Sequence, residues 1–123
     1  MTTIIGTVYK TTSDRDPMPL FTVTVPAGKT SLIYVRVVAG DDAVPMNRHL
    51  VERRWICSDN GIDQYPQELS WVDDASLDIV ITTPDAQNAP QDHQVHVVGN
   101  LNNVSWAVEY KLISTGSATL TEL

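Results

Sequence analysis

The short motif in this sequence that most suggests chemistry is Pro26-Ala27-Gly28-Lys29-Thr30, in which a glycine and a lysine precede a threonine. The same order occurs in loops that bind nucleotide phosphates, where a glycine-rich turn leads into the N-terminus of a helix. Such a loop needs a second glycine five residues before Gly28, but position 23 is a valine, and a β-branched segment follows Thr30. We therefore interpret the motif as the tight turn of a β-hairpin, with Gly28 at a positive φ.

Three histidines offer imidazole groups of the kind that bind zinc. His93 and His96 are three residues apart, and residues at this spacing point to opposite faces of a strand. His49 lies far from both in the sequence. Because Cys57 is the single cysteine, neither an intrachain disulfide nor a multi-cysteine zinc site can form. The spacing favours no metal site, and we expect no metal.

The segment Asp59-Asn60-Gly61-Ile62-Asp63 has the oxygen-rich composition of a calcium-binding loop. The EF-hand pattern requires oxygen ligands at positions one, three and five and a glutamate at position twelve, and this segment does not keep that register. We interpret it as a solvated turn. The acidic pairs Asp41-Asp42 and Asp73-Asp74 are interpreted in the same way, as solvated loop charges.

Nucleophilic catalysis requires a serine or cysteine activated by a histidine that a carboxylate orients. The sequence has no Gly-x-Ser-x-Gly elbow, and Cys57 follows Trp55 and Ile56, a context typical of a small buried thiol. A glycosidase-type pair of acids cannot be identified among the 15 acidic residues. We predict that the chain is not an enzyme and uses no cofactor.

Aromatic residues offer a different kind of site, a platform on which a sugar ring could stack. Trp106 falls on the inward positions of an alternating segment and is predicted to lie in the core. Tyr65 and Trp71 flank loops and are the candidate exposed aromatic residues. The alternative, favoured by the usual roles of large aromatic side chains, is that they are core or subunit-interface residues.

The length and the charge of the chain limit the number of domains and the kinds of partner that it can have. The chain has 123 residues, 42% of them hydrophobic, which predicts one domain spanning residues 1–123. It has 8 basic and 15 acidic residues and a net charge of −7, so we expect neither nucleic acid nor a membrane as partner. The N-terminal residues lack the basic and apolar regions of a signal peptide, which favours synthesis and folding in a cytoplasm.

Alternation of apolar and polar residues dominates the chain and predicts β-strands. Strand signals recur roughly every 10 to 16 residues, so we predict an all-β fold, an antiparallel sandwich of about eight strands, jelly-roll or immunoglobulin-like. Residues 32–39 are apolar on both faces except at Arg36, which predicts a central strand covered on both sides. Only residues 48–57 could also be helical. The last two predicted strands, 93–98 and 104–113, are joined by residues 99–103. The predicted core comprises Val23, Val35, Val37, Ile79, Ile81, Val97, Trp106 and Val108.

The order of the segments VPAGKTSLIYVRVVA, VERRW, DDASLDIVIT and VHVVGNLNNVSWAVEYKLI resembles a small β-sandwich module of tailed-bacteriophage virion proteins. The resemblance covers about residues 19 to 113 and contains no catalytic motif. The connection at residues 83–92 is longer and more polar than that module has.

This resemblance implies a structural role in a virion that assembles in the host cytoplasm. It suggests a capsid decoration, or cement, protein that binds and stabilises the head shell. The alternative is a tail-fibre or tail-tip component that contacts the host surface and binds carbohydrate. The implied partners are further copies of the chain, most plausibly in a homotrimer, and the major capsid protein or other virion proteins.

Contact with such partners would use loops and strand edges. Arg48, Arg53 and Arg54 form the only basic cluster, and arginine is enriched in protein interfaces. The alternative is that Arg53 and Arg54 pair with Asp73 or Asp74 of the same subunit. The candidate interface residues are Arg48, Arg53, Arg54, Asp41, Asp42 and Pro45.

Overall fold

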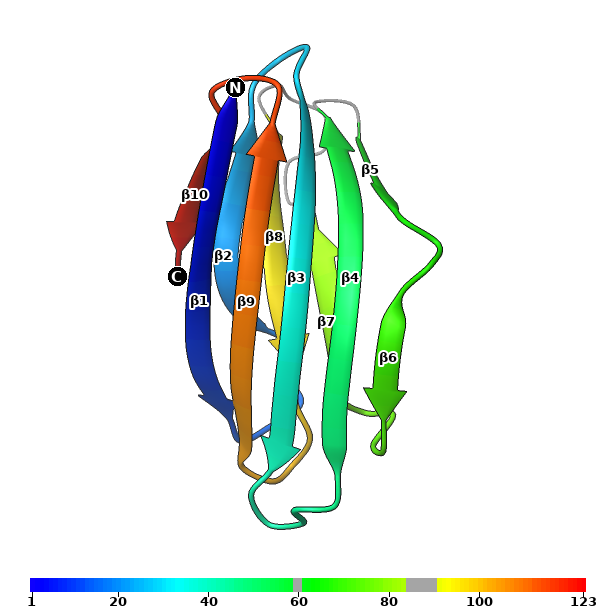
Figure 1. The fold of residues 1–123 in the computed structure, drawn as a ribbon. Helices are drawn as coiled ribbons and strands as arrows, with labels where there is room; N and C mark the ends of the chain where they lie inside the picture. The colour runs from blue at the N-terminus through cyan, green and yellow to red at the C-terminus, as the bar shows by residue number, and fades with distance from the viewer. Residues whose placement is uncertain (59–60, 84–90) are drawn as a thin grey trace.

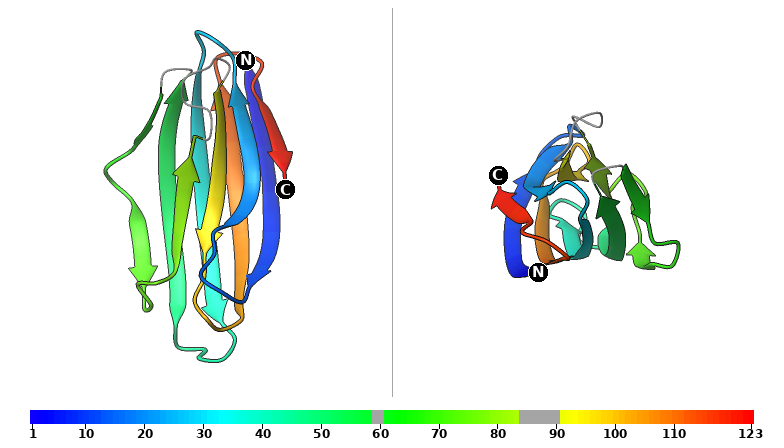
Figure 2. Two further views of the ribbon diagram at one scale, coloured as in Figure 1. Left: turned by 180° about the vertical axis from the view of Figure 1, so that it is seen from behind. Right: turned by 90° about the horizontal axis from the view of Figure 1, so that it is seen from above.

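The structure, a computed structural model, describes residues 1–58, 61–83 and 91–123, and in this part of the chain it contains strands and no helix. The strands form two antiparallel sheets that pack face to face as a sandwich (Figure 1). Seen from above, the sheets are two curved layers around a common core (Figure 2). The predicted all-β sandwich is confirmed. Because the described residues include no helix, they include none that could span a membrane.

The larger sheet has six strands and the smaller has four. The six-stranded sheet has the order β1 (Thr2–Thr12), β9 (Val104–Ser114), β3 (Thr30–Asp41), β4 (Arg48–Ser58) and β5 (Gly61–Gln64), and β6 (Leu69–Val72) also pairs with β4. The four-stranded sheet has the order β10 (Thr119–Glu122), β2 (Met18–Val25), β8 (Gln91–Val98) and β7 (Asp78–Thr82).

Period-two alternation produces the core, since it turns every second side chain of each strand toward the other sheet. In β9 every second residue from Val104 to Leu112 is buried, five in all, and Trp106 is among them as predicted. Of the eight predicted core residues, seven are buried and Ile81 is partly buried against the core.

The structure corrects several predictions about individual elements. Residues 48–57 form strand β4, which is neither helical nor ambiguous, because its inner face is buried against the other sheet. Ten strands are present in the described residues against about eight expected, and three of the ten, β5, β6 and β10, are short strands of four residues each. The strands before and after residues 99–103 belong to different sheets, and β10 follows them.

The Pro26–Thr30 turn reverses the chain as predicted, and the Lys29 amide donates to the Pro26 carbonyl over 3.2 Å. Gly28 has φ 71°, a value that glycine adopts without steric cost. The flanking strands are nevertheless not a hairpin, because β2 pairs with β8 and β10 while β3 pairs with β4 and β9. The turn is thus a corner between the two sheets. Turn residues specify a reversal of direction, and the strands' other neighbours decide the pairing.

Candidate functional site

The outer faces of the two sheets differ in chemistry. The outer face of the four-stranded sheet is polar, with Thr22, Thr24, Gln94 and Thr121 among its outward residues. The outer face of the six-stranded sheet instead presents many of the exposed large hydrophobic residues of the described chain. Figure 1 looks onto this second surface, called here the large-sheet face, and no other described segment lies over it.

The strand registers arrange the large-sheet face into rows that cross β1, β9, β3, β4 and then β5 or β6. Each row is named here by its residue on β3. The Val38 row is Tyr9, Ala107, Val38, Leu50 and Trp71, and the Arg36 row is Thr7, Glu109, Arg36, Glu52 and Leu69. The Tyr34 row is Ile5, Lys111, Tyr34, Arg54 and Tyr65, and the Leu32 row is Thr3, Ile113, Leu32, Ile56 and Asp63.

The two rows at either end are apolar over most of their length, and the two between them carry the charges. In the Val38 row, Tyr9 is 76% exposed, Val38 53% and Trp71 58%. In the Arg36 row, the Arg36 guanidinium pairs with Glu52 at 2.8 Å. In the Tyr34 row, the Arg54 guanidinium carbon lies 5.1 Å from the Tyr34 ring centroid, a cation–π contact.

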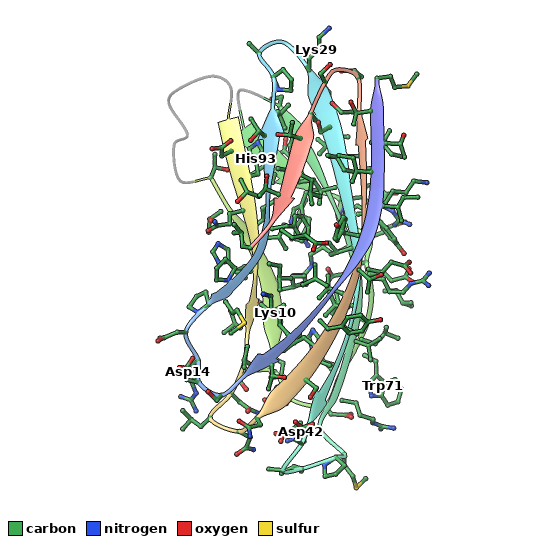
Figure 3. All side chains as sticks on the ribbon, turned by 90° about the vertical axis from the view of Figure 1, so that its left-hand side faces the viewer. Lys10, Asp14, Lys29, Asp42, Trp71 and His93 are labelled. Carbon is green, nitrogen blue, oxygen red and sulfur yellow. The ribbon has the colours of Figure 1, made fainter. Side chains whose placement is uncertain are left out.

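Trp71 forms a small polar group with two neighbours at the end of the Val38 row. Its indole Nε1 donates to Asp73 Oδ1 over 3.1 Å, and Arg48 Nε pairs with Asp73 Oδ2 at 2.9 Å. The Arg48 guanidinium carbon lies 5.5 Å from the Trp71 ring centroid. The hydrogen bond from Arg48 lowers the pKa of Asp73 below its usual value. Figure 3 shows Trp71 on the side of the six-stranded sheet that faces away from the four-stranded sheet.

Two shallow hollows lie on this side of the molecule. One, of about 560 Å³, is lined by residues of the Val38 row together with Gly40 and Arg48. The other, of about 470 Å³, includes Tyr65, Arg54, Ile56 and Asp63 in its lining, and Tyr65 is 49% exposed.

Arg53 lies apart from this face. It points toward the core side of β4, where its guanidinium bonds Glu68 at 2.6 Å, Asp78 at 3.3 Å and the Ile79 carbonyl at 2.5 Å. The alternative that Arg53 and Arg54 pair with Asp73 or Asp74 is wrong. Arg53 forms its ion pairs with Glu68 and Asp78, and Arg54 points to the large-sheet face, where it lies over the Tyr34 ring. Among the three candidate arginines, Arg48 pairs with Asp73.

Asp41 is not a solvated charge, as the sequence had suggested, but is buried at the end of β3. Its carboxylate accepts hydrogen bonds from the side-chain amides of Asn100 and Asn102 and from the backbone amides of Ala43 and Val44, at 2.9 to 3.0 Å. These bonds, that of Asn102 first, hold the pKa of Asp41 well below its usual range. Asp41 therefore organises the loop, and its bonds leave it little capacity to bind a partner.

The other candidate residues in loops differ in how many hydrogen bonds they form within the chain. Asp42 is exposed and accepts a hydrogen bond from the Ser105 hydroxyl over 3.1 Å. Pro45 is exposed in the same loop. Asp74 is not freely solvated either, since it accepts bonds from the backbone and hydroxyl of Ser76 and from Asn100.

The three histidines lie at separate places. His93 is buried between Thr83 and the Ser58 carbonyl, while His96 points to the outer face of β8 beside Thr82. His49 is buried on β4 with its ring 6.0 Å from that of Trp106. The described residues contain no group of three or more His, Cys, Asp or Glu side chains that could hold a metal ion. Of the segment from Asp59 to Asp63, interpreted from the sequence as a solvated turn, Asp59 and Asn60 lie outside the described residues, and Gly61 to Asp63 belong to strand β5.

Cys57 is buried on the inner face of β4, as its context predicts. Burial raises the pKa of its thiol to about 12, so the reactive thiolate is scarce at neutral pH.

Sequence reasoning identified Tyr65, Trp71, Arg48 and Arg54 as candidates but missed the rows that surround them. The signal lay in residues 32–39, whose outward positions are as apolar as a covered strand requires. The described chain covers β3 on one side only.

No protein-family model matches the sequence, and no curated protein matches it. Similar chains occur among solved tailspike proteins. Tailspike gp49 of the Acinetobacter baumannii bacteriophage Fri1, a capsular polysaccharide depolymerase, matches with a TM-score of 0.49 at 11% identity, over 98% of this chain and 20% of that chain. The tailspike of Acinetobacter baumannii phage AM24 has a TM-score of 0.42 at 7% identity, over 97% and 28%. The tailspike of Acinetobacter phage vB_ApiP_P1 has a TM-score of 0.36 at 18% identity, over 92% and 22%. TM-scores below 0.5 at such identities establish no activity for this chain, which spans only 20 to 28% of those proteins.

Proposed function

We propose that this chain is a non-catalytic binding module of a tailed-bacteriophage virion and that it makes contact through the large-sheet face. The virion assignment is supported by the resemblance of its segments to the phage β-sandwich module. The observation that carries the binding role is the contrast between the outer faces, one polar and one with uncovered apolar rows. Contiguous exposed apolar patches on soluble proteins commonly mark interaction sites.

Within the virion we propose a position on the tail, where the chain contacts other tail proteins or the host surface. Attachment to a head shell was expected to use the loop acids and the arginine cluster. Asp41 and Arg53 form their bonds within the chain. Two of the side chains expected to contact a head shell are therefore not available for it.

Antibody labelling of purified particles tests the position. We expect gold label at the tail in electron micrographs and the chain in the tail fraction after heads and tails are separated. Label on the head shell would contradict the tail assignment, and absence from particles would contradict the virion assignment.

The role of the face is tested in the same particles with Val38→Glu, which puts a charge at the centre of an apolar row. We expect a drop of at least tenfold in its incorporation. The matched control is Thr22→Glu, at an outward position of the four-stranded sheet, for which we expect unchanged incorporation. Equal incorporation of both variants would contradict contact through the large-sheet face.

A second candidate function, carbohydrate binding, is favoured by the group of Trp71, Arg48 and Asp73. An exposed indole ring offers an apolar surface for a sugar ring, and the adjacent charged groups can exchange hydrogen bonds with hydroxyls. We expect Trp71→Ala to abolish binding to a glycan array, while Tyr9→Ala, at the far end of the same row, leaves it intact. The absence of any glycan binding by the unmodified chain would contradict this candidate.

A further inference from the structure

We propose that the large-sheet face binds a second copy of this chain, face to face, about a two-fold axis. The axis lies in the interface, parallel to the rows, between the Arg36 row and the Tyr34 row. The inference rests on the proposed function in using the same face, and it goes further by naming the occupant and its register.

The first argument is the size and chemistry of the uncovered surface. The four long strands have 11 or 12 residues each, and β6 has four. With strands ~4.8 Å apart and a rise of ~3.4 Å per residue, their outer face covers roughly 700–900 Å². A stable protein interface buries about 800 Å² on each partner. The central strand β3 has the composition of a strand covered on both sides, yet the described chain covers only its inner side.

The second argument is the order of the rows. A two-fold axis between the Arg36 and Tyr34 rows reverses the order of the four rows and keeps each strand opposite its own copy. It therefore lays the Val38 row on the partner's Leu32 row, which is apolar against apolar on the three inner strands β9, β3 and β4. At the ends of these rows, Tyr9 faces Thr3 and Trp71 faces Asp63. Val38 then faces Leu32, and Leu50 faces Ile56.

The third argument is charge. The same operation lays the Arg36 row, which carries Glu52 and Glu109, on the Tyr34 row, which carries Arg54 and Lys111. On β4, Glu52 faces Arg54 of the other copy, and on β9, Glu109 faces Lys111. Within the described residues Glu109, Lys111 and Arg54 have no ion-pair partner, so these charges are available. Each copy has a net charge of −7, so two copies repel one another on average. In this arrangement, however, acidic side chains of one copy face basic side chains of the other.

Sheets that pack face to face cross at about −30° because of their twist, so the rows superpose best near the axis. The charged rows lie beside the axis, where the register is closest. Neighbouring Leu69 and Tyr65, at the ends of these two rows, then meet as an apolar pair. A three-fold axis, as in the expected homotrimer, would bring different strands together and would not pair Glu109 with Lys111.

Light scattering coupled to size-exclusion chromatography tests the assembly on the full chain. We expect a dimer at about 10 µM, and a monomer for Val38→Glu with its circular dichroism unchanged. Thr22→Glu, on the polar outer face, is expected to stay dimeric. A monomeric or trimeric unmodified chain, or a Val38→Glu variant that remains dimeric, would overturn the inference.

The register is tested by exchanging charges on β9. Glu109→Lys and Lys111→Glu each create two like-charge contacts in the proposed dimer, and we expect each to weaken association at least tenfold. The double variant restores opposite charges at both contacts and should recover the affinity of the unmodified chain. Mixing the two single variants should also produce a dimer, because lysine then meets glutamate at both contacts.

If the double variant and the mixture stay monomeric, the proposed register is wrong. The proposed function would survive that result as long as Val38→Glu still impairs incorporation into particles. It would fail independently if Val38→Glu and Thr22→Glu are incorporated equally well.

Discussion

Gly6 illustrates how one position can be limited to one residue by packing. It lies on β1 beneath the ring of Tyr110, and a Cβ at this position would overlap the Tyr110 hydroxyl. That hydroxyl donates to Glu122 Oε1 over 2.6 Å and so connects β9 to β10. Burial, followed by the bond to Glu122, raises the pKa of Tyr110 to about 12.

We therefore predict that Gly6→Ala lowers the free energy of unfolding by about 1–3 kcal/mol, the usual cost of overpacking. Gly40→Ala is the matched control, since a Cβ there meets no atom within 4 Å and its φ is not positive. Its effect should stay within about 0.5 kcal/mol. Urea denaturation measures both, and equal effects would contradict the packing argument.

His49 gives the stability a dependence on pH. The imidazole is buried, neither of its ring nitrogens has a hydrogen-bond partner in the described structure, and burial lowers its pKa below the ordinary value. His93 and His96 have pKa values lowered for the same reason. Below about pH 6.5 the unfolded chain takes up more protons at these residues than the folded chain does, so stability falls as pH falls.

We predict that the melting temperature decreases between pH 7 and pH 5 and that His49→Leu makes this decrease smaller. An apolar side chain removes both the titrating group and its unpaired nitrogens. His96→Gln, at the outer face of β8, serves as the comparison and should change the slope less. A slope unchanged by His49→Leu would show that another group is responsible.

At the scale of elements, Arg53 connects strand β4 to strand β7 and to the residue just before β6. From β4 it bonds Glu68, just before β6, together with Asp78 and the Ile79 carbonyl in β7. Strand β7 belongs to the other sheet, so this side chain connects the two layers at their edge. Arg54 follows it directly but points to the large-sheet face.

We predict that Arg53→Ala lowers the free energy of unfolding by about 1–3 kcal/mol, because it removes the bonds from the guanidinium to Glu68, Asp78 and the Ile79 carbonyl. Arg54→Ala should change it by less than about 0.5 kcal/mol. Both are best measured in the Val38→Glu background, so that self-association does not contribute. A larger loss for Arg54→Ala would reverse the assignment of the two arginines.

The same elements indicate how far sequence reasoning reaches. Alternation is a local property, so it located β9 and nearly all of the predicted core. Sheet membership is not local, which is why the turn at Gly28 was predicted to be a hairpin when it is a corner between sheets. The rows depend on register between distant strands, such as β1 and β9, where Val8 lies opposite Val108. Asp41 was misassigned because its amide partners come from a loop about 60 residues away in the sequence.

For the whole molecule, the buried residues of both sheets form one continuous core. We therefore predict a single cooperative unfolding transition for residues 1–123. Fluorescence, which reports on the buried Trp55 and Trp106, should coincide with circular dichroism, which reports on the strands. Transitions with different midpoints would show that the chain contains more than one cooperative unit.

The pairing of β1 with β9 has a consequence for how the chain reaches this structure. Thr2 lies opposite Ser114 and Thr12 opposite Val104, so the one strand that pairs with β1 among the described residues is made about a hundred residues after it. Loop closure over such a distance is entropically costly, and folds dominated by non-local strand pairing fold in milliseconds to seconds. During synthesis β1 therefore cannot take its place in the six-stranded sheet until β9 has been made, whereas β3 and β4 can pair as soon as β4 is complete.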